Sequence, residues 1–302
     1  MRNLRRVLCT AGVLSAGVLL AAAGSASAAV LIGVKTSPAY EQVPGTGGGT
    51  YFAWSRGFPA TLFIQSDAGQ PAVRVNNPRN SQAWAGSIDG TTLVYQRAHA
   101  DQSDIRLWDV VAKTPLPPPA GVNTPNWEWH PTMSGDWILF GRVAYDRHRS
   151  RVLLHNTMTS QTITLADVQG LGTDAEPGQV SGNWAVWDRC AHGVCNVFRY
   201  DITDDLIEPL PNDFVGKLQY FPSVTSAGTV YYVHSGNGCG RNVKLIEGVP
   251  AQPQTLLVQF GPGRDVTSTT QTVPDQTAGT DVYFDKYKCS NGTSDIYKIV
   301  VP

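Results

Sequence analysis

Short apolar stretches of four to six residues recur along the chain, and each follows a turn of small residues that ends in glycine. The clearest pair is SGDWILFGR (134–142) and SGNWAVWDR (181–189), which begin 47 residues apart. Apolar runs of this length between turn residues are typical of buried β-strands, because a helix needs a longer periodic segment. The pattern therefore predicts strands, and it indicates that one structural unit is repeated.

The turn glycine marks six copies of this unit. It occurs at Gly49, Gly90, Gly135, Gly182, Gly228 and Gly279. Most copies carry an aromatic residue five places later. These residues are Trp54, Tyr95, Phe140, Trp187 and Phe284, and the fifth copy has Val233 instead. A second strand follows each copy at a nearly constant offset and a third follows most of them, so the unit has about 45 residues and four short strands.

A four-stranded antiparallel unit of this size cannot bury both of its faces alone. Stacking six units around an axis gives every sheet two neighbours, which is the arrangement of a β-propeller. We therefore predict an all-β fold, a six-bladed β-propeller of four-stranded antiparallel blades. The sixth copy ends after its third strand, and VLIGV (30–34) precedes the first copy. We expect this segment to supply the missing outer strand and lock the ring; the alternative is a frayed terminus.

The first 28 residues have the pattern of a secretory signal peptide. Arg2, Arg5 and Arg6 precede an apolar segment, and small residues at Ala26–Ala28 suit cleavage. Cleavage would leave residues 29–302 as a single propeller domain, exported by a bacterial cell. No later stretch approaches the roughly 18 apolar residues of a membrane helix, so we expect no membrane insertion.

Charge argues against a nucleic-acid partner. Removing the three signal arginines from 23 basic and 24 acidic residues leaves 20 and 24, a net charge of −4. This is too mild to suggest binding to nucleic acid or to an anionic membrane. Only 16% of the residues are charged, while Gly (30) and Pro (20) are plentiful, which suits short strands and many turns. We expect a monomer.

Several stretches carry a family resemblance: SDIRLWD (103–109), SDIYK (294–298), PTMSGDWILFGR (131–142) and SIDGTTLVYQR (87–97). They resemble the WD40-like repeats of TolB-type propellers, in which a proline, a glycine-ended turn, an apolar strand and Ser-Asp-Ile-Tyr recur in each blade. The resemblance covers nearly all of residues 29–302, and it does not include the α/β domain of TolB. It implies the propeller fold and a binding role in an exported compartment.

Four cysteines follow the predicted signal peptide, and an even number in an exported chain favours disulfides. Cys190 and Cys195 flank a four-residue hairpin, so we expect them to pair. Cys239 and Cys289 occupy matching hairpins of neighbouring blades, and we pair them as well. A metal site is the alternative reading, but no histidine stands at suitable spacing, and we expect neither a metal nor a cofactor.

Cations recur seven places after the turn glycine. They are Arg56, Arg97, Arg142, Arg189 and Lys286, with Ser235 in the fifth copy. Equivalent positions share one end of a propeller, so Arg97, Arg142 and Arg189 are candidates for binding a carboxylate, a phosphate or an acidic glycan. Alternatively, each cation pairs within its own blade, for example with Asp104, Asp188 or Asp295.

Aromatic and acidic residues occur on the predicted innermost strands. Trp84, Trp129 and Tyr220 are expected to share one register, and Glu41, Glu128 and Asp174 another. Aromatic platforms beside carboxylates are typical of sugar sites, and two carboxylates are the minimum for glycoside hydrolysis. The alternative is that the aromatics fill the core between blades. His130 next to Glu128 is neither a metal site nor a general-base constellation.

No established catalytic signature is present: the sequence has no G-x-S-x-G elbow, H-E-x-x-H motif, phosphate loop or EF-hand loop. The first functional hypothesis is an exported binding or scaffold module whose partner is a protein, a cell-envelope polymer or a small ligand. The alternative is an extracellular carbohydrate-active enzyme that uses Glu128 with Asp174 or Glu176. The sequence identifies neither the ligand nor the face that binds it.

Overall fold

Apolar and aromatic residues fill the second strand of every repeat, and each repeat folds into a small antiparallel sheet. The computed structural model of the chain describes residues 30–35, 42–45, 50–66, 70–75, 80–144, 149–212, 218–235, 243–261, 264–265, 271–275 and 279–301. Every helix or strand within these ranges is a β-strand. The predicted signal peptide, residues 1–28, lies outside the described residues.

The first three units follow the chain from one repeat to the next. The first contains β2 (Gln42–Pro44), β3 (Tyr51–Arg56), β4 (Thr61–Ser66) and β5 (Val73–Arg74). The second contains β6 (Ser81–Asp89), β7 (Thr92–His99), β8 (Gln102–Asp109) and β9 (Thr114–Leu116). The third contains β10 (Trp127–Ser134), β11 (Trp137–Val143), β12 (Arg149–Asn156) and β13 (Thr162–Gln169).

The last three units continue the same order. The fourth contains β14 (Thr173–Ser181), β15 (Trp184–Ala191), β16 (Val194–Asp201) and β17 (Leu206–Pro209). The fifth contains β18 (Leu218–Val224), β19 (Val230–Ser235), β20 (Val243–Gly248) and β21 (Thr255–Phe260). The sixth contains β22 (Arg264–Asp265), β23 (Gln271–Asp275), β24 (Gly279–Lys288), β25 (Thr293–Val301) and β1 (Val30–Lys35).

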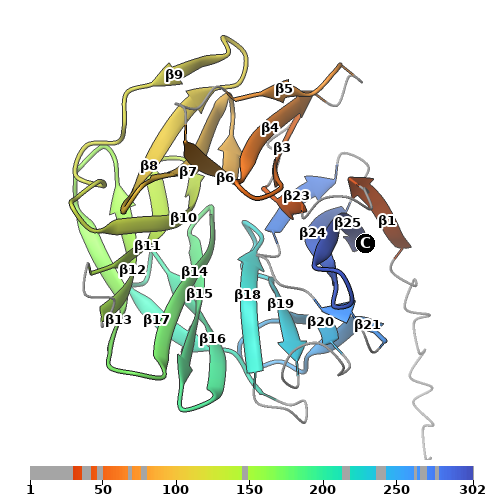
Figure 1. Cartoon of the computed structure of the whole chain (residues 1–302). Helices are drawn as coiled ribbons and strands as arrows, with labels where there is room; N and C mark the ends of the chain where they lie inside the picture. The colour runs from red at the N-terminus through yellow and green to blue at the C-terminus, as the bar shows by residue number, and fades with distance from the viewer. Residues whose placement is uncertain are drawn as a thin grey trace, which may run out of the picture.

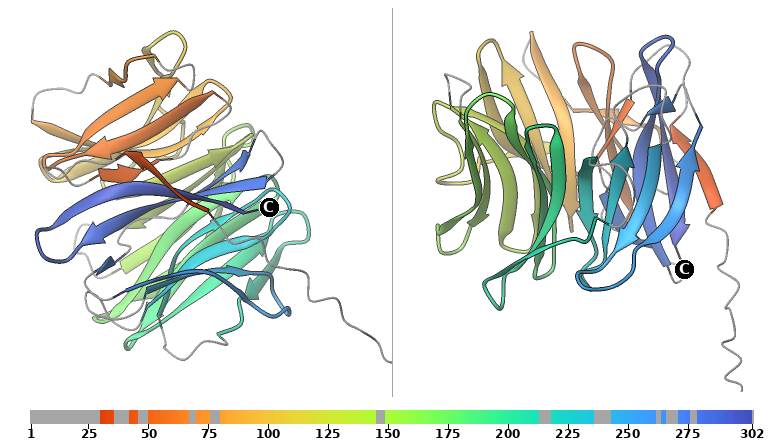
Figure 2. Two further views of the ribbon diagram at one scale, coloured as in Figure 1. Left: turned by 90° about the vertical axis from the view of Figure 1, so that its right-hand side faces the viewer. Right: turned by 90° about the horizontal axis from the view of Figure 1, so that it is seen from below.

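The six units follow one another around a centre, with the first strands of the units nearest to it (Figure 1). Strands within a unit pair antiparallel, while β8–β10 and β16–β18 meet across units through single parallel bridges. Side views show the sheets of neighbouring units packed face to face (Figure 2). The predicted all-β, six-bladed propeller is therefore the observed fold.

Packing between units closes the ring. We call the contact between two successive units a seam. Each buried apolar cluster among the described residues combines side chains of two successive units, and there is one such cluster for every seam. The cluster of Phe52, Trp54 and Ile296 joins the first unit to the last. Packing in the seams covers the apolar faces that a single small sheet would leave exposed to water.

The fifth unit contains a one-residue displacement that the repeat count did not predict. Tyr232, not Val233, lies in the seam with the fourth unit, and it is fully buried there. Val233 instead faces the sixth unit and pairs with Tyr220. The fifth unit therefore has an aromatic seam residue like the others, and the exception at Val233 came from counting through a longer turn.

The N-terminal strand pairs with the last strand of the chain. β1 runs antiparallel to β25, with Val30 opposite Val300 and Ile32 opposite Lys298, and it is the outer strand of the sixth sheet. The predicted pairing is present. That the ring depends on this strand to stay closed remains a prediction.

Candidate functional site

Three seams carry the same hydrogen bond between units. A backbone N–H of the innermost strand of one unit donates to a side chain on the second strand of the unit before it. The bonds are Ala85 N to Ser55 Oγ (2.7 Å), His130 N to Gln96 Oε1 (3.4 Å) and Phe221 N to Asp188 Oδ2 (3.1 Å). All three acceptors are buried and stand six places after a turn glycine, so we call this the linker position. The bond satisfies an N–H group that would otherwise be buried without a partner.

The seam between the third and fourth units has neither half of this bond. Its linker position is Gly141, which has no side chain, and the facing residue is Pro177, which has no N–H. The indole of Trp129 occupies the vacated space, because a Cβ atom on Gly141 would lie 2.3 Å from Trp129 Nε1. The side chain of Trp129 therefore depends on glycine at position 141.

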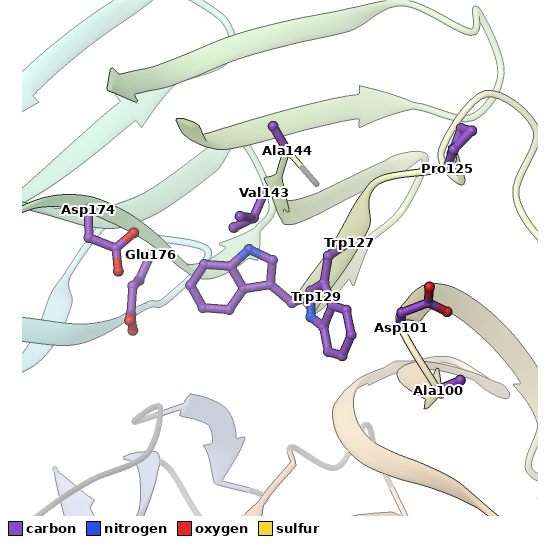
Figure 3. A pocket seen from close by; sticks show the side chains of 9 residues that line it. All are labelled: Ala100, Asp101, Pro125, Trp127, Trp129, Val143, Ala144, Asp174 and Glu176. Carbon is purple, nitrogen blue, oxygen red and sulfur yellow. The ribbon is translucent and has the colours of Figure 1, made fainter. Parts of the chain in front are cut away.

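A cavity of about 730 Å³ opens beside this seam. Its lining residues come from the second, third and fourth units: Ala100, Asp101, Pro125, Trp127, Trp129, Val143, Ala144, Asp174 and Glu176. Trp129 lies at the centre of the wall, with Asp174 and Glu176 on one side and Trp127 and Asp101 on the other (Figure 3). We call this space the channel-mouth cavity. Its volume is in the range of small-molecule sites.

Two neighbouring carboxylates on β14 form one side of the cavity. Asp174 and Glu176 are two residues apart on one strand, so their side chains project from the same face. Burial, and next to it the negative charge of Asp174, raise the pKa of Glu176 to about 7. Asp188 lies opposite Glu176 on β15, and burial followed by the charge of Glu176 raises its pKa well above the usual range. The bond from Phe221 N lowers that pKa in part.

His130 supports the aromatic wall from behind. It is the residue after Trp129, its backbone has a φ of +45°, and its ring lies 4.7 Å from the Trp129 ring. Burial lowers the pKa of His130 to about 4, so the imidazole is neutral near pH 7. His130 therefore brings no positive charge to the cavity.

Glu128 does not line the cavity. Its side chain is fully buried, and Oε1 accepts hydrogen bonds from Thr124 Oγ1 (2.6 Å) and Arg142 Nε (2.8 Å). Burial raises the pKa of Glu128, and the bonds from Thr124 and Arg142 oppose that rise. The register predicted for Glu128 and Asp174 was wrong by one residue. Ser150 Oγ bonds the carbonyl of Ala175 as Ser103 Oγ bonds that of Glu128, so the counterpart of Glu128 is Ala175.

The predicted register of the three aromatic residues is confirmed, but only one of them reaches the cavity. Trp84, Trp129 and Tyr220 each precede the residue that faces a linker position, and Glu176 is their counterpart in the fourth unit. Trp84 and Tyr220 are partly buried in their own units. Of the predicted residues, the structure brings together Trp129 and Asp174, with Glu176 from the alternative hypothesis. Glu41 lies outside the described residues.

The repeated cations contact different partners and are not gathered into one site. Arg142 pairs with Glu128, Lys286 lies over the rings of Phe260 and Tyr297, Arg56 lies over Phe63, and Arg189 is exposed. Arg97 lies opposite Asp104, whose ion-pair partner at 2.5 Å is Arg106. Asp295 pairs with Lys288 at 3.1 Å. None of these cations lines the channel-mouth cavity. Anion binding by Arg97, Arg142 or Arg189 stays a prediction.

The cysteines support the predicted disulfide pattern in part. Cys190 and Cys195 are bonded across the β15–β16 hairpin, as predicted. Cys289 is also disulfide-bonded. Its predicted partner, Cys239, lies outside the described residues.

Two absences apply to the described ranges alone. No group of three or more His, Cys, Asp or Glu side chains there is arranged to hold a metal ion. The same part of the chain includes no helix with the length and apolar character of a membrane span.

Comparison with solved structures gives the same fold. The structure of a putative TolB from Agrobacterium tumefaciens matches with a TM-score of 0.58 and 15% identity, over 87% of this chain and 91% of that one. TolB from Acinetobacter baumannii matches with a TM-score of 0.54 and 15% identity, over 85% of this chain and 65% of that one, so this chain spans about two thirds of it. An oligogalacturonate lyase in complex with manganese matches with a TM-score of 0.54 and 8% identity, over 91% and 97%.

No family model and no curated protein matches the sequence. The structural likenesses establish a TolB-like propeller fold. At such low identity they establish the fold alone.

Sequence reasoning missed the two residues that define the site, Gly141 and Pro177. The signal was present, because the position six places after the turn glycine is Ser55, Gln96 and Asp188 in three other units and glycine in the third. Trp127 and Asp101 were also missed, since they lie at strand ends where the repeat pattern is weakest.

Proposed function

We propose that this protein is an exported β-propeller that works as a binding module and holds its ligand in the channel-mouth cavity. The observation that carries the proposal is the cavity itself, a space of about 730 Å³ bounded by two indoles and three carboxylates. Apolar walls with a few polar groups are typical of ligand sites. The site also lies where the third unit departs from the repeat, at Gly141.

Export is supported by two features. Residues 1–28 have the charged, apolar and small-residue segments of a signal peptide. The Cys190–Cys195 disulfide suits an oxidising compartment. The ligand would then be an extracellular or cell-envelope molecule, whether a polymer, a protein segment or a small compound.

The proposal is tested with two matched variants, Trp129→Ala and Trp84→Ala. Both remove a partly buried tryptophan from the same register of an innermost strand, and only Trp129 lines the cavity. Ligands are sought by glycan array and by pull-down from envelope extracts with the wild-type protein. We expect Trp129→Ala to lose binding and Trp84→Ala to retain it. Equal binding by both variants would place the ligand elsewhere.

A carbohydrate-active enzyme is the second candidate, and one observation favours it. A carboxyl with a pKa of about 7, as at Glu176, suits a general acid, and Asp174 is a second carboxylate beside it. Glu128 no longer belongs to this hypothesis, because its carboxylate is buried and paired with Arg142. Turnover of a polysaccharide that Glu176→Gln abolishes, with binding retained, would favour the enzyme over the binding module.

A further inference from the structure

Among the residues that the structure describes, the negative charge in the channel-mouth cavity has no positive counterpart. Asp101, Asp174 and Glu176 line the walls, and no Lys, Arg or His is among the lining residues. Within the described residues, none of these three carboxylates takes part in an ion pair. Asp101 is exposed, whereas Asp174 and Glu176 are half-buried, and a half-buried negative charge without a compensating group costs free energy.

Two cations on the second strands of the third and fourth units, Arg142 and Arg189, are directed elsewhere. Arg142 donates to Glu128 Oε1 at 2.8 Å and to the Val122 carbonyl at 2.5 Å. Arg189 is the neighbour of Asp188 along β15, so its side chain projects from the opposite face of the sheet. The part of the chain that the structure describes therefore supplies no cation to the cavity.

A fourth acidic residue, Asp188, lies on the strand next to Glu176. It lies directly opposite Glu176, and its hydrogen bond within the described residues comes from a backbone N–H of Phe221, not from a cation. Burial, and next to it the negative charge of the neighbouring carboxylates, raise the pKa of both Glu176 and Asp188. A bound cation would take the place of such a proton.

The two indole rings of the cavity are a second kind of group that can bind a cation. Trp127 and Trp129 form the wall between the two acidic sides (Figure 3). The faces of indole rings attract cations, and the attraction grows when water is excluded. Trp129 Nε1 is buried without an acceptor among the described residues.

We propose that the channel-mouth cavity recognises an organic cation, an ammonium group held between the indoles of Trp127 and Trp129 and the carboxylates of Asp174 and Glu176. This inference rests on the proposed function and names the chemical class of its ligand. The ammonium can belong to a free small molecule or to a lysine side chain of a partner. An acidic glycan is disfavoured, because the described walls would present three carboxylates to it.

Isothermal titration calorimetry with matched probes tests the inference. Choline and 3,3-dimethyl-1-butanol have the same shape and differ in charge, and Nα-acetyl-lysine amide is compared with its Nε-acetylated form. We expect each cation to bind at least about 10-fold more tightly than its neutral counterpart. Asp174→Asn and Glu176→Gln are each expected to weaken binding of the cations about 10-fold. Asp204→Asn, on an exposed turn of the fourth unit, serves as the control and leaves binding unchanged.

The outcomes separate the inference from the proposed function. Equal binding of a cation and its neutral partner, lost in Trp129→Ala, would overturn the inference and leave the cavity as a binding site. Weakening of cation binding by Asp204→Asn as large as that by Glu176→Gln would show only diffuse attraction, and would also overturn it. No binding of any cation at millimolar concentration overturns it too, while the glycan array and pull-down still test the proposed function.

The two sources of the ammonium are distinguished by the same titrations. Tighter binding of the lysine amide than of choline, abolished by Nε-acetylation, supports the inference with a lysine side chain as the ligand. The reverse order supports it with a small quaternary amine.

Discussion

The seam between the second and third units and the seam between the third and fourth solve one packing problem in two ways. In the first, Gln96 Oε1 accepts from His130 N (3.4 Å), and Gln96 Nε2 donates to Ser103 Oγ (2.9 Å). In the second, Gly141 and Pro177 occupy the corresponding places, and no such bond exists. The first seam is filled by a polar side chain; the second borders a cavity.

This difference shows how a repeat can form a site at low energetic cost. Removing one partner of a buried hydrogen bond leaves the other unsatisfied, whereas removing both is nearly neutral. Gly141 removes the acceptor and Pro177 removes the donor. The seam remains joined by Val180 N, which donates to Thr132 Oγ1 (3.1 Å), and by the apolar cluster around Trp187. The linker bond was therefore lost from this seam without leaving one of its two partners orphaned.

The largest effect is expected for Gly141→Gln, which gives the third unit the linker residue of the second unit. The new Cβ would lie 2.3 Å from Trp129 Nε1, so the indole must leave its place on the cavity wall. We expect ligand affinity to fall about 100-fold, measured by calorimetry with the tightest ligand found for the wild type. Undiminished affinity would show that the cavity does not hold the ligand.

The opposite change, Gln96→Ala, removes the linker from the intact seam. It leaves His130 N without its acceptor, and we expect the free energy of unfolding to fall by about 1–3 kcal/mol. Urea denaturation measures this change, and ligand affinity should be conserved because Gln96 does not line the cavity. A loss below about 0.3 kcal/mol would mean that the linker bond contributes little to the seam.

The variant Glu176→Gln tests the raised pKa of a carboxyl in the fourth unit through the pH dependence of the free energy of unfolding. The pKa of Glu176 is raised to about 7, so between about pH 4.5 and 7 the folded state binds more protons than the unfolded state. The free energy of unfolding of the wild type therefore loses the Glu176 contribution as pH rises through this window. We expect Glu176→Gln to be more stable than the wild type by about 1–2 kcal/mol at pH 8 and equal to it near pH 4.

Thermal or urea unfolding of both proteins across this range is the measurement. His130 titrates in both proteins, so its contribution cancels in the difference, whereas Asp188 contributes to the difference together with Glu176, because the charge of Glu176 raises the pKa of Asp188. A difference that does not depend on pH would contradict the raised pKa of Glu176.

The smallest expected effect is a coupling between Gly141→Gln and Pro177→Ala. Together these changes restore an acceptor and a donor at the third seam. We expect the double variant to be more stable than the sum of the single variants by about 1 kcal/mol, as a double-mutant cycle would show. Additive effects would mean that the restored groups do not meet, and that the likeness between the two seams is superficial.

The ring of six units was predictable because its signal is local and repeated. The turn glycine, the apolar strand and the aromatic seam residue lie within eight positions of one another. Because the pattern occurs six times, it can be recognised even where a single copy deviates from it. Tyr232 shows the limit, since the turn before β19 has five residues, against two in the second, third and fourth units, and this longer turn displaced the count in the fifth unit. Alternation along a strand predicts which face a side chain occupies only while the register is known.

The site was less predictable because it depends on a departure from the repeat. Glu128 and Asp174 were placed in one register, although they differ by one residue and therefore face opposite sides. Trp129 and Asp174 were identified from their residue types. Trp129 and Asp174 line one cavity because Gly141 and Pro177 remove the linker bond from this seam. That role of the two residues is evident only when the linker positions of successive units are compared in the structure.

The indole N–H region of the protein NMR spectrum tests the central claim most directly. The chain has eight tryptophans, and Trp127→Phe and Trp129→Phe assign the two that line the cavity. During titration with a bound ligand, we predict that these two resonances shift together with one dissociation constant, while those of Trp54 and Trp187, buried in other parts of the seams, stay in place. Saturable binding that leaves the Trp129 resonance unmoved would contradict the account.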